Sequence, residues 1–361
     1  MIDMDSKCIN SLKGIGILGV VLVHCGLGVH EGTVASVAAS GARGVQLLFV
    51  INAFLIFHSL EKTEFSRRQL IKWYIRRFVR IIPLYWFFTI LHLLVFGLGE
   101  RYYLGTLSNV SLLNILCNML FLHGFHPYYI NSINANWFMA DLAVFYLLAP
   151  LLYKLIDSLE KAVIALLVTT PMGYLLYHFA LGQDVLGVKA IWTDYVTILS
   201  FPAEFPVILL GIFSYFVIKE SHKWRNKGII SAVTLFFSLF CMVSLIMGKR
   251  YFMIFNYIFS FGVLFTVIFI GQAQSSSRLV NNRFFALFGK HSYGIYLSHL
   301  FFVSAIPDNG LKPGACVIRY CAVAAGALLT AVVSEKVIEQ PLVGLINNKI
   351  QDREKKRGGY E

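Results

Sequence analysis

Charge is scarce in this sequence. Only 14% of its 361 residues are Asp, Glu, Lys or Arg, whereas soluble globular domains carry about a quarter. Hydrophobic residues make up 57%, and the mean hydropathy is +0.69. The apolar runs are continuous rather than alternating, which argues against a membrane β-barrel. The composition therefore predicts an all-α, polytopic membrane helix bundle.

Metal and nucleotide motifs are also missing. The sequence contains no HExxH, Walker A or GxGxxG pattern, and its six cysteines form no CxxC pair. Most of these cysteines lie within apolar segments, where they are expected to act as small hydrophobic residues. We predict no metal site and no tightly bound cofactor.

The net charge of +12 is unevenly distributed. Seven basic residues lie in 61–80, four in 219–227 and six from 335 onward, whereas loops 30–43, 99–136, 182–195 and 307–313 hold one each. Clusters between apolar runs follow the positive-inside rule, so we predict membrane lipids rather than nucleic acid as partners. The three basic regions are expected to be cytoplasmic, as are both termini.

Ten segments are long and apolar enough to span a bilayer. A shorter apolar stretch, 110–125, is predicted not to span, because its crossing would invert the charge assignment of every later loop. We expect a membrane domain over 1–341 and a polar cytoplasmic tail over 342–361. The predicted spans are 13–29, 44–60, 82–98, 137–156, 161–181, 196–218, 228–247, 252–271, 285–306 and 314–334.

The first apolar segment contains two polar side chains that carry the functional prediction. Lys13 and His24 are eleven residues apart, which places them on one face of a helix, roughly 16 Å from each other. His24 is then expected near the middle of the bilayer. Ionisable residues at such depth usually face a cavity, although a buried histidine bonded to a backbone carbonyl is the alternative.

A second basic cluster follows the next span. Arg77 and Arg80 are three residues apart and share a helix face, and Pro83 is expected in the first turn of the following helix or at a break before it. Clustered guanidinium groups bind phosphates through paired hydrogen bonds. With Lys13 they predict a cytoplasmic anion pocket below His24; binding of lipid headgroups by these arginines is the alternative.

Six stretches resemble, in order, motifs of the membrane-bound acyltransferase-3 family. The resemblance covers nearly the whole chain. The matching stretches are KGIGILGVVLVH from residue 13, GVQLLFVINAFLIF (44–57), RRFVRIIPLYW (76–86), NWFMADLAVFYLLAP (136–150), LFGKHSYGIYLSHLFF (287–302) and VIEQPL (337–342).

The resemblance implies transfer of an acyl group, usually acetyl, from acyl-coenzyme A to a sugar hydroxyl of a bacterial surface polysaccharide or lipid-linked glycan. It implies an enzyme of the bacterial inner membrane, with His24 as the catalytic residue, acting either as a general base or as an acyl relay. Lys13, Arg77 and Arg80 would bind the phosphates of coenzyme A, which is a co-substrate. A sugar hydroxyl needs a general base, and imidazole titrates near neutral pH.

Several positions depart from the family pattern. Lys13 stands where the family commonly has Arg. Lysine keeps the positive charge but lacks the planar guanidinium that forms paired hydrogen bonds. Two glutamates common in the family are replaced by Leu142 and Ala143, leaving Asp141 as the nearby acid. Asp141 is a second catalytic candidate that could orient a catalytic group or the sugar; an extracytoplasmic interface residue is the alternative.

Six further residues are candidates for binding the acceptor. Glu204 is an acid within an apolar segment between two prolines, and broken helices often line cavities. His299 lies seven residues after Ser292, on nearly the same helix face, and is equally compatible with a packing role. The predicted contacts are Trp137, Tyr146, Glu204, Ser292, Tyr293 and His299.

Two other functions compete with acyl transfer. A transporter or flippase for a lipid-linked sugar or small organic acid would also place His, Asp and Glu inside a bundle. A glycan polymerase should have a large, basic external loop, but the predicted external loops are short and nearly free of Lys and Arg. The cationic cluster below His24 favours a coenzyme A donor, and transport stays the alternative.

Overall fold

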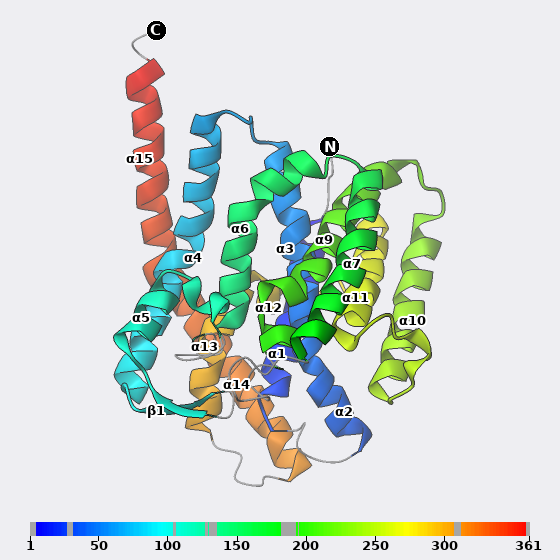
Figure 1. Ribbon diagram of the computed structural model, residues 1–361, viewed down its shortest axis with the longest axis horizontal. Helices are drawn as coiled ribbons and strands as arrows, with labels where there is room; N and C mark the ends of the chain where they lie inside the picture. The colour runs from blue at the N-terminus through cyan, green and yellow to red at the C-terminus, as the bar shows by residue number, and fades with distance from the viewer. Residues whose placement is uncertain are drawn as a thin grey trace.

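The protein is a helical bundle in the computed structural model, shown in Figure 1. The structure describes residues 5–26, 32–103, 106–126, 129, 136–181, 193, 195–306 and 312–358. Besides helices, these ranges hold one antiparallel hairpin of β1 (Glu100–Tyr103) and β2 (Thr106–Asn109). Its register pairs Glu100 with Asn109. The predicted all-α membrane architecture is confirmed.

Eight helical segments within the described ranges have the length and hydropathy of membrane spans. Two further predicted spans correspond to α7 and to the α12–α13 pair. The helices are α1 (Ser6–Val23), α2 (Thr33–Ser40), α3 (Gly44–Glu61), α4 (Arg67–Phe96), α5 (Leu112–Met119), α6 (Trp137–Leu155), α7 (Leu159–Leu181), α9 (Phe201–Glu220), α10 (Lys227–Ile246), α11 (Tyr257–Gln274), α12 (Arg283–Lys290), α13 (Ser292–Ala305), α14 (Pro313–Ser334) and α15 (Gln340–Gly358). Short 3-10 or π turns are η2 (Gly41–Arg43), η3 (Leu122–Phe125), η4 (Tyr195–Leu199), η5 (Ser221–Lys223), η6 (Arg250–Phe252) and η7 (Glu335–Glu339).

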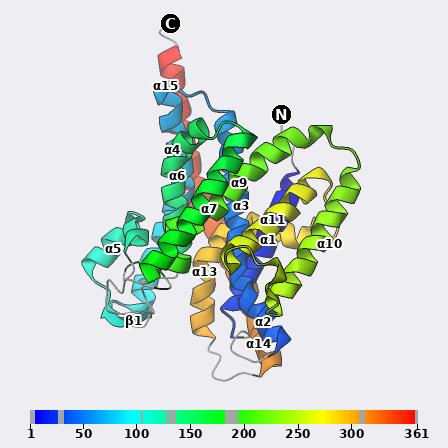
Figure 2. The same cartoon turned by 45° about the vertical axis from the view of Figure 1, so that its right-hand side comes forward.

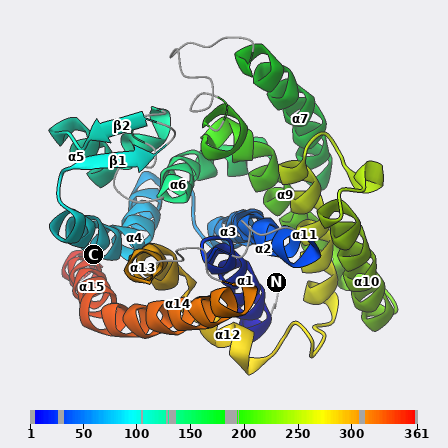
Figure 3. The same cartoon turned by 90° about the horizontal axis from the view of Figure 1, so that it is seen from below.

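The bundle has two distinct ends. Figure 1 shows that α1 begins, α3 ends, α4 begins and α15 ends at the same end, which we call the basic end. The opposite, outer end carries α2, the hairpin and the last turn of α13. Viewed along the bundle in Figure 3, α1 and α3 are central, with α4, α6, α13 and α14 on one side and α7, α9, α10 and α11 on the other.

The bounds predicted for the first span are wrong. Helix α1 begins seven residues before Lys13 and ends at Val23, so His24 is its C-cap and not a mid-helix residue. Gly26 follows with a φ of 86°, a left-handed conformation that glycine adopts without steric cost and that ends helices. His24 consequently lies at the outer end of α1.

The predicted break before Pro83 is also wrong. Helix α4 runs without interruption through Pro83 for 30 residues, so the basic stretch is helical and not a loop. Ser66 caps its start by accepting a hydrogen bond from the Gln69 amide. At 1.5 Å per residue the helix is about 45 Å long, which exceeds the thickness of the hydrocarbon core. Its basic first half therefore extends out of the core that the apolar half crosses.

The predicted continuous span 285–306 is broken at His291. Helix α12 ends at Lys290 and α13 starts at Ser292, because the polar triplet Lys290, His291 and Ser292 interrupts the apolar run. The break places the N-terminus of a 14-residue helix inside the bundle. This change of direction builds part of the site described below.

The stretch 110–125 forms the eight-residue helix α5 and the turn η3. Eight residues rise about 12 Å, well short of the hydrocarbon core. In Figure 2, α5 and the hairpin project from the side of the bundle opposite α10. The length of α5 agrees with the prediction that this stretch does not span.

Glycines allow α1 to pack directly against α12. A Cβ added to Gly14 would lie 1.9 Å from the Phe285 carbonyl oxygen, and one added to Gly289 would lie 1.6 Å from that of Asn10. Both distances are far below any contact that a methyl group tolerates. The interface positions Lys13 beside the start of α13.

We expect Gly289→Ala to destabilise the protein. The methyl group meets rigid backbone, so α1 and α12 must separate, and such overpacking costs about 1–3 kcal/mol or more. The midpoint of thermal unfolding in detergent should fall by roughly 5 °C. Gly228→Ala is the matched control, because nothing lies within 4 Å of its added Cβ. Equal midpoints for the two variants would contradict the close packing.

Candidate active site

A pocket of about 160 Å³ lies between α1, α3, α4, α6, α13 and η7, in the half of the bundle nearer the basic end. It brings together residues that are far apart in the chain. Six of the residues predicted from the sequence line it: Lys13, Tyr146, Arg77, Arg80, Ser292 and Tyr293.

The three predicted cations take different positions in this pocket. Arg80 lies at its mouth, with 69% of its side chain exposed. Arg77 is partly buried, and its guanidinium lies over the Trp73 ring, 5.5 Å from the centroid. The positive charges of both arginines act on the Lys13 ammonium. Like charges held together in a partly enclosed site favour an anionic ligand.

The start of α13 adds a further electropositive element. The pocket is lined by Gly289, Lys290, His291 and the first residues of α13, and no side chain caps this helix. Backbone N–H groups at a helix N-terminus lack intrahelical partners and carry partial positive charge. Together with Lys13, Arg77 and Arg80, these groups form a site suited to phosphate.

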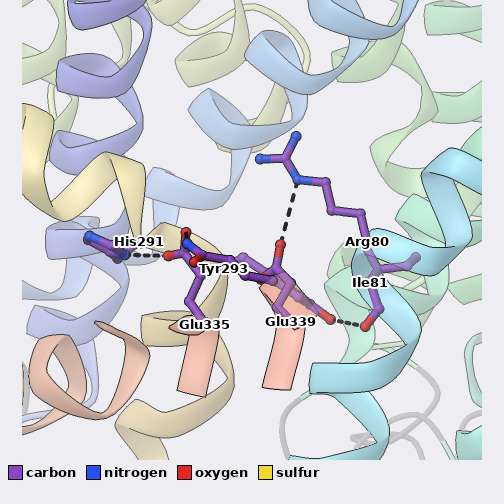
Figure 4. Close-up of polar contacts among 7 residues, drawn as sticks. Arg80, Ile81, His291, Tyr293, Glu335 and Glu339 are labelled. Carbon is purple, nitrogen blue, oxygen red and sulfur yellow. Dashed lines mark hydrogen bonds and ion pairs between the residues drawn. The ribbon is translucent and has the colours of Figure 1, made fainter. Parts of the chain in front are cut away.

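Two carboxylates, Glu335 and Glu339, also line the pocket and contact its basic residues (Figure 4). Glu335 Oε2 is 2.5 Å from His291 Nδ1, and Glu339 Oε1 is 3.9 Å from Arg80 Nε. Tyr293 donates a hydrogen bond of 2.5 Å from its hydroxyl to the Ile81 carbonyl. These contacts connect α13, η7 and α4 around the mouth of the pocket.

We expect Glu339→Gln to bind coenzyme A, the co-substrate that the family resemblance implies, a few-fold more tightly. The substitution removes a negative charge beside Arg80 from a pocket suited to phosphate, and the effect is modest because Arg80 is solvated. Titration calorimetry in detergent at low salt measures it. Glu160→Gln, on the exposed first turn of α7, is the control. Weaker binding would instead mean that Glu339 holds Arg80 in its binding position.

The inner end of the pocket leads toward two histidines. Phe138, Leu142 and Tyr296 are buried there. The ring centroids of Tyr296 and His299 are 6.0 Å apart, and those of His299 and His24 are 5.3 Å apart. His24 and His299 are thus joined to the pocket through Tyr296, although neither lines it.

Asp141 and Glu204 belong to a second polar cluster. Both are buried, at 1% and 0% exposure, and Gln46 donates a hydrogen bond of 2.7 Å to Glu204 Oε1. Asp141 thus lies among the helices, out of contact with solvent. The positive charge of Arg43 also interacts with the Glu204 carboxyl group. In the described part of the chain, neither acid is hydrogen-bonded or ion-paired to His24.

Trp137 lies away from the pocket. It is the first residue of α6, which begins toward the outer end, and its ring centroid is 6.3 Å from that of Phe49. The structure therefore divides the predicted residues into the pocket, the histidine pair, the Asp141–Glu204 cluster and Trp137.

Residues that the sequence interpretation missed complete the pocket. Asn10, Lys290, His291 and Glu335 line it, and none was predicted. Lys290 and His291 interrupt an apolar run, which is the signal that could have revealed the helix break. Within the described residues, no three His, Cys, Asp or Glu side chains come close enough to hold a metal ion.

These features define a polytopic membrane protein with a cationic pocket leading toward a pair of histidines, His24 and the buried His299. The family model described as an acyltransferase domain, Acyl_transf_3, matches residues 6–335. The chain therefore belongs to the acyltransferase-3 family and is a membrane-embedded acyltransferase. Comparisons with curated proteins and with solved structures find no match.

Proposed function

We propose that this acyltransferase moves a short acyl group, most simply acetyl, from acyl-coenzyme A to a sugar hydroxyl. The acceptor is a surface polysaccharide or its lipid-linked precursor, and the enzyme resides in the bacterial inner membrane with its basic end in the cytoplasm. The observation that carries the proposal is the cationic pocket, which runs from solvent at Arg80 to Tyr296 beside the histidine pair.

The donor binds from the basic end. Its phosphates contact Lys13, Arg77 and Arg80 and the free N–H groups of α13, because clustered cations and a helix N-terminus both favour polyphosphate. The pantetheine arm passes between the buried side chains of Phe138 and Leu142. This orientation directs the thioester toward Tyr296, His299 and His24.

His24 acts as the general base. An unprotonated ring nitrogen takes the proton of the acceptor hydroxyl as its oxygen attacks the thioester carbonyl. The C–S bond breaks as the O-acyl bond forms, and the proton moves from His24 to the departing sulfur. Direct transfer of this kind consumes one acyl-coenzyme A and releases one thiol for each ester.

The acceptor approaches from the outer end. Oδ2 of Asp141 and Oε2 of Glu204 are buried and have no hydrogen-bond partner among the described residues. Unpartnered buried oxygens are costly, and sugar hydroxyls are suitable donors for them. Asp141 orients the attacking hydroxyl in this proposal, Glu204 binds a neighbouring one, and Trp137 provides an aromatic surface for the sugar ring.

Proton NMR of surface polysaccharide tests the proposal. Cells lacking the gene are complemented with wild type or with His24→Ala, and spectra are taken before and after mild base. We expect a base-labile acyl signal that only the wild type restores. Identical acylation in all strains, including the deletion, would contradict the proposal and favour transport of a lipid-linked sugar or acid.

A further inference from the structure

His299 has a fixed hydrogen-bonding arrangement on one side of its ring. Its Nδ1 lies 2.7 Å from the carbonyl oxygen of Tyr296 and 3.2 Å from that of Ile295, both in the preceding turn of α13. The side chain is buried, at 1% exposure. Since carbonyl oxygens only accept hydrogen bonds, Nδ1 carries the proton.

The other ring nitrogen is left as an acceptor. A neutral imidazole with a proton on Nδ1 has a lone pair on Nε2, and a buried ring without a counter-ion favours the neutral form. Nε2 of His299 is buried and has no hydrogen-bond partner among the described residues. The α13 backbone thus selects the tautomer of His299 that is protonated on Nδ1, and Nε2 is left as a buried acceptor without a partner among the described residues.

His24 and Tyr296 both place a ring beside His299, and the His24 ring is the nearer of the two. The centroids of His24 and His299 are 5.3 Å apart, and the ring planes are inclined by 43°. Two imidazoles joined by one N–H···N hydrogen bond at their edges have centroids about 5 Å apart. The observed separation of 5.3 Å is close to this value, and His24 lies just beyond the last turn of α1.

We propose that His299 is a positioning residue whose Nε2 accepts a hydrogen bond from one ring nitrogen of His24. The other nitrogen of His24 is then unprotonated and can take the proton of the acceptor hydroxyl. His299 neither gains nor loses a proton in the cycle. The same proton passes from the hydroxyl to His24 and then to the departing sulfur. This inference rests on the proposed function for its kinetic consequences, although the pairing itself does not.

Kinetics of two substitutions separate positioning from packing. His299→Phe keeps a ring of similar size but has no acceptor, and His299→Gln restores an acceptor atom. We expect kcat for acetyl transfer to fall about 100-fold in His299→Phe, with KM for acetyl-coenzyme A unchanged within twofold, because only orientation of the base is lost. The kcat of His299→Gln should be at least tenfold higher than that of His299→Phe. His92→Phe, another buried histidine that contacts α13 through Phe301, is the matched control.

Nitrogen-15 NMR of histidine-labelled protein in detergent measures the pairing without any acyl transfer. We expect the His24 resonances, assigned with His24→Ala, to show one dominant tautomer in the wild type and tautomer exchange in His299→Phe. Two equally populated tautomers in the wild type, or a kcat of His299→Phe within twofold of wild type, would overturn the inference. Absence of acyl transfer in the wild type would contradict the proposed function, and the NMR result would still decide the pairing.

Discussion

His24→Ala should lower acyl transfer by at least 100-fold while leaving the protein folded and able to bind coenzyme A. General base catalysis typically contributes about 10²–10⁴ in rate, and the substitution removes the group that takes the proton in the proposed mechanism. The donor pocket is lined by other residues, so the loss should appear in kcat and not in donor affinity. Thiol release from acetyl-coenzyme A, followed in detergent with the acceptor glycan, measures this change.

Two controls make the result interpretable. The unfolding midpoint and the dissociation constant for coenzyme A should stay close to those of the wild type, since His24 lies at the C-cap of α1 and does not line the pocket. His178→Ala, on the exposed side of α7, should transfer at the normal rate. Normal acylation by a well-expressed His24→Ala variant would remove His24 from the mechanism.

The membrane architecture was predictable because hydrophobicity is a local signal. The predicted segments 44–60 and 137–156 agree with α3 and α6 to within one residue. The location of Lys13, Arg77 and Arg80 at one end of the bundle was also predictable, because clustered positive charge marks one membrane face. Matching family motifs strengthened both predictions.

The course of the helices was only partly predictable. The polar triplet Lys290, His291 and Ser292 signals the break between α12 and α13, whereas continuation of α4 through Pro83 depends on packing between helices, which overrides local propensity. Side-chain pairs between distant segments were equally hidden. Nothing in the spacing of His24 and His299, or of Gln46 and Glu204, specifies that they meet. These pairs arise from the tertiary arrangement of α1 with α13 and of α3 with α9.

The arrangement gives each end of the bundle a separate chemical character. Cations and a helix N-terminus lie in the half nearer the basic end, whereas unpartnered carboxylate oxygens lie near the starts of α6 and α9, toward the outer end. A polyanionic donor and a hydroxyl-rich acceptor therefore prefer opposite ends. The histidine pair lies where α1 and α13 bring the two regions together.

Arg77→Ala should raise the dissociation constant for coenzyme A by about 10- to 100-fold. A hydrogen bond between charged groups contributes about 1.5–3 kcal/mol, and each 1.4 kcal/mol corresponds to a tenfold change. The Trp73 ring beneath the guanidinium holds it in the pocket, so little side-chain freedom is lost on binding. The dissociation constant of Arg77→Lys should fall between those of the wild type and Arg77→Ala, because lysine keeps the charge and loses the paired hydrogen bonds.

Comparison with Arg76→Ala distinguishes phosphate binding from a general effect of basic charge. Arg76 precedes Arg77 on α4, is exposed and does not line the pocket, so its removal lowers the same net charge without removing a ligand contact. We expect Arg76→Ala to bind coenzyme A within twofold of wild type. Raising the salt concentration should weaken coenzyme A binding by the wild type more than by Arg77→Ala, because salt screens charge interactions and the variant has one fewer of them. Equal affinities of Arg76→Ala and Arg77→Ala would mean that the arginines of α4 attract anions or lipid headgroups only through their overall charge, and that the donor phosphates bind elsewhere.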